Sequence, residues 1–315
     1  SALAAADRHT DDRPVLDFRA PLAIHAQTGP ENRAFLLPED APKDRATIRQ
    51  RLDLLGVSSS VVWQYELAER ALALGIADRG IAEDFVRAAV RLRREEDAAR
   101  ALTAALLRGG GAGVMVAQAL LAWNVGDAET AMQALEAAAK ADPKEAAAYR
   151  LGAEIQSAVS NLPAMRKLIA RALAVNPKDP EAIGLAAEAE LKDNRLEPAY
   201  RLADGALRLD PQESRALEVR ALALAQLGRV AEARNAFLAL LAAQPDAPSP
   251  RANFGVFELR SGNASAAARL FRDAIDLDPS SPEGYQGLRE AATALKSVEL
   301  QAAAERGLRR LNVPF

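Results

Sequence analysis

A recurrence of 34 residues organises much of this 315-residue chain. Five prolines that follow an acidic or amide residue mark it, each 34 positions after the one before: Pro143, Pro177, Pro211, Pro245 and Pro279. Equal spacing indicates a structural repeat, and a period of this length holds two helices and two turns. The chain is therefore expected to stack similar helix pairs, because no single pair can bury its apolar face alone.

Other positions in the same frame agree with a unit of helix, turn and helix. The position seventeen before each proline holds a residue type that tolerates a tight turn. These residues are Gly126, Ser160, Asn194, Gly228 and Gly262. Twelve and five residues before each proline the side chains are mostly small, and would let helices approach closely: Ala131, Ala138, Ala172, Ala199, Ala206, Ala233, Ala267 and Ala274. Larger residues eight before the proline, among them Phe237 and Phe271, would fill the space between helices.

This spacing resembles the tetratricopeptide repeat. Five units are assigned, over 112–145, 146–179, 180–213, 214–247 and 248–281. The resemblance implies an all-α fold, a right-handed superhelical solenoid of antiparallel helix pairs. Residues 282–315 are expected to form capping helices, with Arg306, Arg309 and Arg310 on a polar face, and apolar spacing predicts degenerate helical repeats over 45–111.

Residues 1–44 differ from the rest, because five prolines interrupt any helical period, and we expect an irregular arm there. Residues 10–21 are similar to the C-terminal edge of spermidine synthase-like domains in bacterial membrane-fused proteins, where a Thr-Asp-Asp-x-Pro run precedes the last strand. The resemblance implies that the chain is the C-terminal repeat region of a longer protein with membrane-spanning and aminopropyltransferase-like parts. The alternative is an arm that packs along the helices. No catalytic residue is carried over, because the Gly-rich loop and aspartates of that family have no counterpart here.

Composition argues against chemistry on this chain. It has no Cys, and its two His, His9 and His25, stand apart in the arm, so neither a thiolate site nor a three-His metal site can form. The Gly-rich run at 109–113 lacks the Lys-Ser/Thr ending of a phosphate-binding loop and is interpreted as a turn between helices. Ser58 to Ser60 are interpreted as a helix cap. We therefore expect no enzymatic activity, no cofactor and no metal.

The charges nearly cancel, with 40 Lys and Arg against 43 Asp and Glu, so a nucleic-acid partner is not expected. The sequence contains no run of about 18 uncharged apolar residues, the length needed to span a membrane. No basic-then-apolar leader is recognised. The lack of Cys fits cytoplasm and periplasm alike. The cytoplasm is favoured, and attachment to a membrane protein stays open.

A solenoid of helix pairs lines its concave surface with the first helix of every repeat. Positions two, five, nine and twelve of each repeat point there, and the predicted partner-binding residues are Val116, Leu120, Trp123, Arg150, Glu154, Glu188, Leu191, Arg215, Glu218 and Leu222. Ser157 and Glu181 share this register. Trp123 either anchors a partner or packs on the preceding helices. The mixed lining favours a helix or extended peptide with an apolar anchor and a few charges.

The sequence thus predicts a non-catalytic scaffold that binds a protein or peptide segment in this groove. One alternative is a regulatory or assembly module of a membrane-associated spermidine synthase-like aminopropyltransferase protein. Another is self-association through the degenerate first helices, which would give a homo-oligomer.

Overall fold

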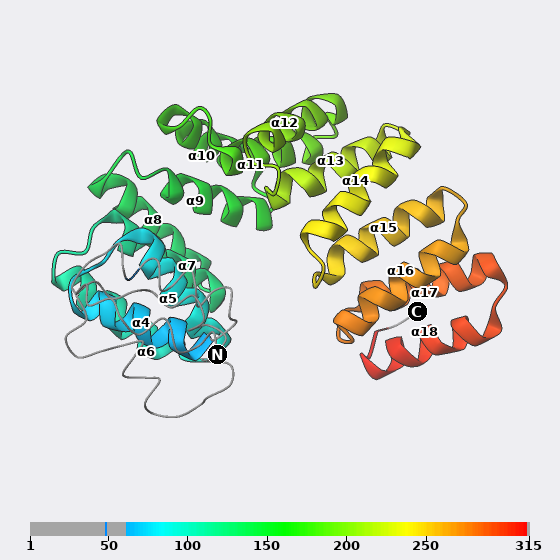
Figure 1. Cartoon of the computed structure of the whole chain (residues 1–315), viewed down its shortest axis with the longest axis horizontal. Helices are drawn as coiled ribbons and strands as arrows, with labels where there is room; N and C mark the ends of the chain where they lie inside the picture. The colour runs from blue at the N-terminus through cyan, green and yellow to red at the C-terminus, as the bar shows by residue number, and fades with distance from the viewer. Residues whose placement is uncertain (1–47, 49–60, 314–315) are drawn as a thin grey trace, which may run out of the picture. The chain divides into compact units, whose positions relative to one another are not determined.

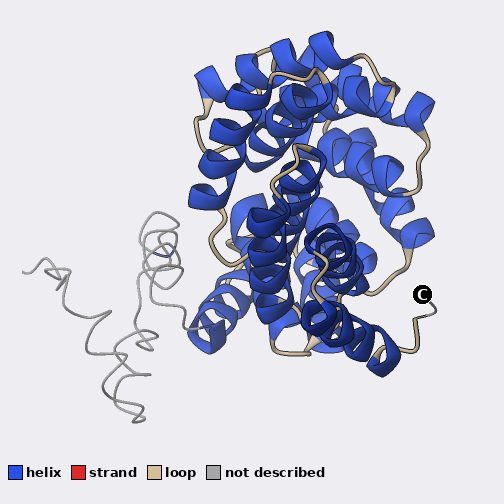
Figure 2. Ribbon diagram, turned by 90° about the vertical axis from the view of Figure 1, so that its right-hand side faces the viewer, coloured by secondary structure: helices blue, strands red, loops and turns tan. Residues whose placement is uncertain are grey.

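The computed structural model describes Ile48 and residues 61–313, and these residues contain fifteen α-helices and no β-strand (Figures 1 and 2). In chain order the helices are α4 (Val61–Ala73), α5 (Arg79–Arg91), α6 (Glu95–Leu107), α7 (Ala112–Asn124), α8 (Ala128–Ala141), α9 (Ala146–Ala158), α10 (Leu162–Val175), α11 (Pro180–Lys192), α12 (Leu196–Leu209), α13 (Ser214–Gln226), α14 (Val230–Ala243), α15 (Pro248–Arg260), α16 (Ala264–Leu277), α17 (Pro282–Leu295) and α18 (Val298–Arg310). The all-α prediction is confirmed. The predicted arm over 1–44, with both His residues, and the predicted cap at Ser58 to Ser60 lie outside the described residues.

The chain divides into two compact units, Ser1–Pro143 and Lys144–Phe315. In the first unit, α5 packs against α4, α6 and α7, and α7 pairs with α8. The core of this unit contains Tyr65 and Phe85, both fully buried, with ring centroids 4.9 Å apart. The guanidinium carbon of Arg94 lies 4.3 Å from the centre of the Tyr65 ring and covers it.

The second unit consists of five helix pairs, α9–α10, α11–α12, α13–α14, α15–α16 and α17–α18. Three of the first helices begin with a proline in their first turn, Pro180, Pro248 and Pro282, where the missing N–H is not needed. The last pair covers the end of the predicted array, and its Arg306, Arg309 and Arg310 are exposed.

One residue with positive φ ends the first helix of six successive pairs. These residues are Gly126, Ser160, Asn194, Gly228, Gly262 and Lys296, with φ between 55° and 88° and a spacing of 34. In each case the next N–H bonds to the carbonyl five residues earlier, as Ser297 does to Ala292 at 2.9 Å. The five turns predicted from the sequence are confirmed, and Lys296 provides a sixth.

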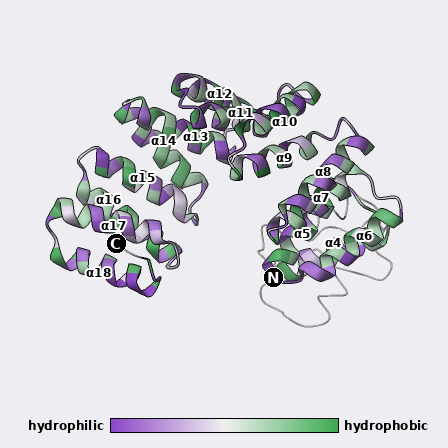
Figure 3. Ribbon diagram, turned by 180° about the vertical axis from the view of Figure 1, so that it is seen from behind, coloured by the Kyte–Doolittle hydropathy of each residue, from purple (hydrophilic) through white to green (hydrophobic). Residues whose placement is uncertain are grey.

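Alanine allows the helices to pack closely. The eight alanines predicted at small positions are at most 3% exposed, and Figure 3 shows hydrophobic and hydrophilic residues alternating along most helices. Phe237 fills the space between α14 and α15, where it stacks on Phe254 at a centroid distance of 5.1 Å and contacts Phe257 at 5.3 Å. Small side chains therefore lie where helices approach closely, and large side chains fill the space between helices, as predicted from the 34-residue repeat.

Candidate partner-binding surface

The ten predicted groove residues divide between the two units. Val116, Leu120 and Trp123 lie on α7 in the first unit. Val116 is only 1% exposed, because α5 packs against α7, so the prediction that it lines an accessible surface is corrected. Leu120 packs, partly buried, against the core of that unit, and Trp123 is half-buried.

The other seven residues lie on the first helices of the second unit, namely Arg150 and Glu154 on α9, Glu188 and Leu191 on α11, and Arg215, Glu218 and Leu222 on α13. Successive first helices contact one another, α9 with α11, α11 with α13 and α13 with α15, and among the residues of this unit up to 313 no comparable contact joins successive second helices. The first helices therefore lie on the inner side of the stack in this unit. We define the inner face by Arg150, Glu154, Ser157, Asp179, Glu181, Glu188, Lys192, Glu213, Arg215, Glu218 and Asn253.

Arg215 connects three first helices. Its Nη1 donates to Oε2 of Glu188 on α11, and its Nη2 lies 3.2 Å from Oε1 of Glu154 on α9. The Ser157 hydroxyl donates to Oε1 of Glu188 at 2.5 Å, and Nζ of Lys192 lies 3.3 Å from the same oxygen. The centre of the inner face is therefore held by charge-assisted hydrogen bonds.

The pKa values around Arg215 follow from these contacts. Burial by itself would raise the pKa of Glu188, but the hydrogen bonds from Ser157 and Arg215 outweigh burial and lower it. Burial would lower the pKa of Arg215, but Glu188 and Glu154 raise it above its ordinary value. Both partners of this ion pair are therefore charged at neutral pH.

A second ion-pair group begins at Arg150. Its Nη1 donates to Oδ2 of Asp179, and its Nε lies 2.9 Å from Oε2 of Glu181. Asp179, 4% exposed, also caps α11, because its Oδ1 accepts the N–H of Glu181 at 3.1 Å and that of Ala182 at 3.3 Å. One carboxylate thus fixes both the start of α11 and the Arg150 side chain.

Glu213 caps the next first helix in the same way. Glu213 is 8% exposed. Its carboxylate accepts hydrogen bonds from the backbone N–H of Arg215 at 3.2 Å and from that of Ala216 at 2.5 Å. Burial raises the pKa of Glu213, and these two backbone hydrogen bonds offset only part of the rise.

Two further carboxylates are incompletely neutralised. Burial raises the pKa of Glu154, and Arg215 compensates only in part. Burial and the charge of Glu188 raise the pKa of Glu218, which accepts a hydrogen bond from the Asn253 amide at 3.1 Å. No Lys or Arg of the described chain lies within ion-pair distance of Glu218. The inner face therefore contains negative charge that its own cations do not balance.

The sequence frame located Ser157 and Glu181 but missed Asp179, Glu213, Lys192 and Asn253. Asp179 and Glu213 stand directly before the first residue of a helix, and this N-cap position was a signal for both. Lys192 follows Glu188 by four residues, a spacing that favours an ion pair on one helix.

Asn253 carried no such signal, because its contact with Glu218 depends on how α15 packs against α13. Leu191 and Leu222 are half-buried and pack against the core of their unit. These two residues form the apolar edge of the inner face.

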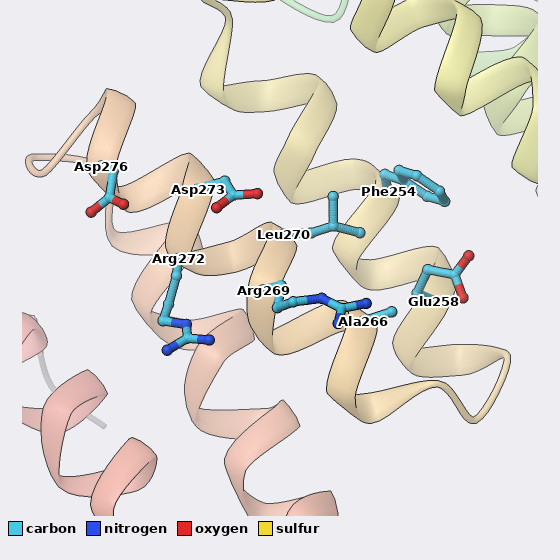
Figure 4. Close-up of a pocket in the computed structure, with 8 residues that line it drawn as sticks. All are labelled: Phe254, Glu258, Ala266, Arg269, Leu270, Arg272, Asp273 and Asp276. Atoms are coloured by element: carbon cyan, nitrogen blue, oxygen red, sulfur yellow. The ribbon is translucent and has the colours of Figure 1, made fainter.

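A separate hollow of about 550 Å³ lies over α15 and α16 (Figure 4). It is lined by Phe254, Glu258, Ala266, Arg269, Leu270, Arg272, Asp273 and Asp276. None of the ten predicted residues lines it. Its exposed charges are of both signs, so it favours no ligand of one charge.

The described residues give no indication of a metal or membrane site. No group of three His, Cys, Asp or Glu side chains among them is placed to hold a metal ion. Within the same residues, no helix combines the length and apolar character required to cross a membrane.

Comparison with known proteins gives two matches to family models, both described as tetratricopeptide repeat, over residues 112–145 and 186–248. Among curated proteins, no match to this sequence is found. The similarity of residues 10–21 to spermidine synthase-like domains receives no support from these comparisons, and that segment lies outside the described residues.

Solved structures share the arrangement of helices. The type IV pilus biogenesis factor PilW has a TM-score of 0.58 and 20% identity, over 63% of this chain and 92% of that chain. A thermophilic TPR protein of Thermus thermophilus has a TM-score of 0.51 and 20% identity, over 59% of this chain and all of that chain. A chain in the crystal structure of the APC/C hetero-tetramer Cut9–Hcn1 has a TM-score of 0.65 and 12% identity, over 87% of this chain and 58% of that chain.

At these identities the similarity concerns the fold alone. Together with the 34-residue period and the positive-φ turns, it agrees with the two family matches. This chain therefore contains tetratricopeptide repeats, folded as a solenoid of antiparallel helix pairs.

Proposed function

We propose that this chain is a non-catalytic scaffold that binds a segment of a partner protein along the inner face of its second unit. Tetratricopeptide repeats commonly provide extended surfaces for protein–protein interaction. The observation that carries the proposal is the Arg215 network, in which side-chain ion pairs connect α9, α11 and α13.

Ordered charges on three adjacent helices suit recognition of a peptide. The ion pairs fix the side chains before a partner arrives, so less conformational entropy is lost on binding. Accessible groups remain among them, because the side chain of Glu181 is 59% exposed and that of Glu154 is 40% exposed. A partner segment lying across the first helices would contact both.

Affinity capture from the source organism with three tagged proteins tests the proposal. The first is the wild type, and the second carries Glu154→Lys and Glu181→Lys on the inner face. The third carries Asp273→Lys and Asp276→Lys on α16, where both carboxylates are exposed, so that its net charge matches that of the second.

We expect the wild type and the α16 variant to retain the same proteins and the inner-face variant to lose a specific subset. Circular dichroism and the unfolding midpoint verify that all three are folded. Identical retained proteins for three folded samples would show that the inner face is not the binding surface.

A further inference from the structure

Carboxylates outnumber cations on the inner face. The carboxylates are Glu154, Asp179, Glu181, Glu188, Glu213 and Glu218, and the cations are Arg150, Lys192 and Arg215. The difference, six against three, leaves the surface with a formal charge of −3. The carboxylates lie on α9, α11 and α13 and at the N-caps of α11 and α13, so the charge is spread across the face.

Every cation of the inner face is already engaged by at least two acceptors. Arg150 contacts Asp179 and Glu181, and Arg215 contacts Glu154 and Glu188. The Lys192 ammonium donates to the Ser157 carbonyl at 2.8 Å and to its hydroxyl at 2.7 Å, and it also pairs with Glu188. An anionic partner would therefore compete with these acceptors for the same cations.

Several carboxylates can instead accept further hydrogen bonds. Glu181 has one ion pair and is largely exposed, and Glu154 has one ion pair, with Arg215 at 3.2 Å. Glu218 is half-buried and has only the Asn253 amide as a partner. A partner cation next to Glu218 would supply opposite charge at a site that folding has already partly desolvated, which strengthens such a contact.

The neighbouring part of the inner side is apolar. Asn253 connects Glu218 to α15, and the inward register of α15 contains Ala252, Val256 and Leu259 with no charged residue. Val256 is 38% exposed and so presents apolar surface at this part of the inner side. Leu222 lies one helical turn beyond Glu218 on α13 and continues this apolar edge.

We propose that the inner face binds a cationic peptide segment, in which Lys or Arg side chains face α9 to α13 and an adjacent apolar side chain lies on Val256. This inference rests on the proposed function, since it names the chemistry of the partner for the same surface.

Three fluorescein-labelled peptides of equal length test the proposal, with Leu alternating with Lys, with Glu or with Gln. Fluorescence anisotropy at about 0.15 M salt measures their affinity for the full chain, because weak surface electrostatics are screened under these conditions. We expect the Lys–Leu peptide to bind and the Glu–Leu peptide to bind at least about tenfold more weakly, since like charges would be brought together.

Variants then locate the contact. The double change Glu154→Gln and Glu218→Gln preserves side-chain shape and removes two negative charges. It should weaken the Lys–Leu peptide roughly five- to tenfold, because two partner cations lose their opposite charge. The matched control, Asp273→Asn with Asp276→Asn on α16, should leave the affinity within about twofold.

The other outcomes distinguish this inference from the proposed function. If all three peptides bind equally and Val256→Ser weakens them, the inner face is a docking surface but the cationic preference is wrong. If the α16 pair weakens the Lys–Leu peptide and the inner-face pair does not, the peptide binds at the hollow over α15 and α16 and both proposals fail. Absence of binding by the Lys–Leu peptide also overturns the cationic inference, whereas the capture experiment still tests the proposed function.

Discussion

The carboxylate of Glu213 occupies the space in which a side chain at Gly184 would stand. A Cβ at Gly184 would lie 2.5 Å from Oε2 of Glu213, the oxygen that accepts the N–H of Ala216. The middle of α11 thus approaches the start of α13 so closely that a larger residue would displace the cap.

Substitution of Gly184 should therefore fail to give the usual stabilisation. Ala in place of Gly in a helix ordinarily raises the free energy of unfolding by about 0.5–1 kcal/mol. We expect this gain for Gly205→Ala on α12, where the nearest atom to a new Cβ would be Nη2 of Arg208 at 3.7 Å. For Gly184→Ala, the lost cap costs about 1 kcal/mol and cancels the gain, so the variant is neutral or destabilised.

Urea denaturation of both variants measures the difference. In a Glu213→Ala background, Gly184→Ala should recover the ordinary gain, because no carboxylate then occupies the space. Equal stabilisation at Gly184 and Gly205 in the otherwise wild-type chain would contradict the prediction.

The repeat was predictable because backbone geometry imposes it on the sequence. A tight turn between antiparallel helices needs a residue with positive φ, and glycine at positions 126, 228 and 262 satisfies this need without strain. Lys296 could not be predicted in the same way, since Lys has no preference for positive φ. Its conformation follows from the hydrogen bond between the Ser297 N–H and the Ala292 carbonyl.

The site was predictable only in part, because register along a helix does not show what covers it. Glu154, Glu188 and Arg215 share the register of Val116, yet α5 buries Val116 and the other three form a network. Which carboxylate each cation contacts depends on the distance between successive first helices. Composition and period do not contain that distance.

Lys296 offers a stabilising substitution. Its φ of 55° costs an L-residue about 1 kcal/mol relative to ordinary helical backbone. Lys296→Gly should therefore raise the free energy of unfolding by about 0.5–1 kcal/mol, less than the full penalty because Gly is more flexible when unfolded. Asn194→Gly is the matched control at the same turn position, and it should have a smaller effect because Asn tolerates positive φ. Thermal and urea unfolding measure both, and a larger gain at Asn194 would contradict the argument.

Glu218 should make stability depend on pH in an unusual direction. Burial raises the pKa of Glu218 above its ordinary value of 4.5, so the protonated form favours the folded state. The stabilising contribution is fully present below the unfolded pKa and is lost as the pH rises through the folded pKa. Glu218→Gln should therefore raise the free energy of unfolding by roughly 0.5 kcal/mol at pH 7 and by little at pH 4.

Urea denaturation at the two pH values measures the effect of Glu218→Gln. Asp273→Asn, on the exposed side of α16, serves as the control and should change stability equally at both pH values. A gain from Glu218→Gln that is as large at pH 4 as at pH 7 would show that shape rather than charge is responsible.

Glu258 should show the opposite dependence on pH. It is 3% exposed, and Arg234 donates to it from Nε at 2.6 Å and from Nη2 at 3.0 Å, while the Asn263 amide donates at 2.6 Å. The Arg234 hydrogen bonds lower the pKa of Glu258 although burial opposes them. A carboxyl group with a lowered pKa contributes stability above its unfolded pKa, and this contribution is lost as the pH falls through the folded pKa.

Arg234→Met should therefore destabilise the chain at pH 7, because a buried carboxylate is left with one amide donor. The difference from the wild type should narrow as the pH is lowered through the ordinary Glu range, where protonation removes the charge that needs a partner. Arg269→Met, at an exposed position on α16, should leave the pH profile unchanged. A difference that does not change with pH would point instead to lost packing, because the Arg234 guanidinium carbon also lies 5.9 Å from the centre of the Phe257 ring.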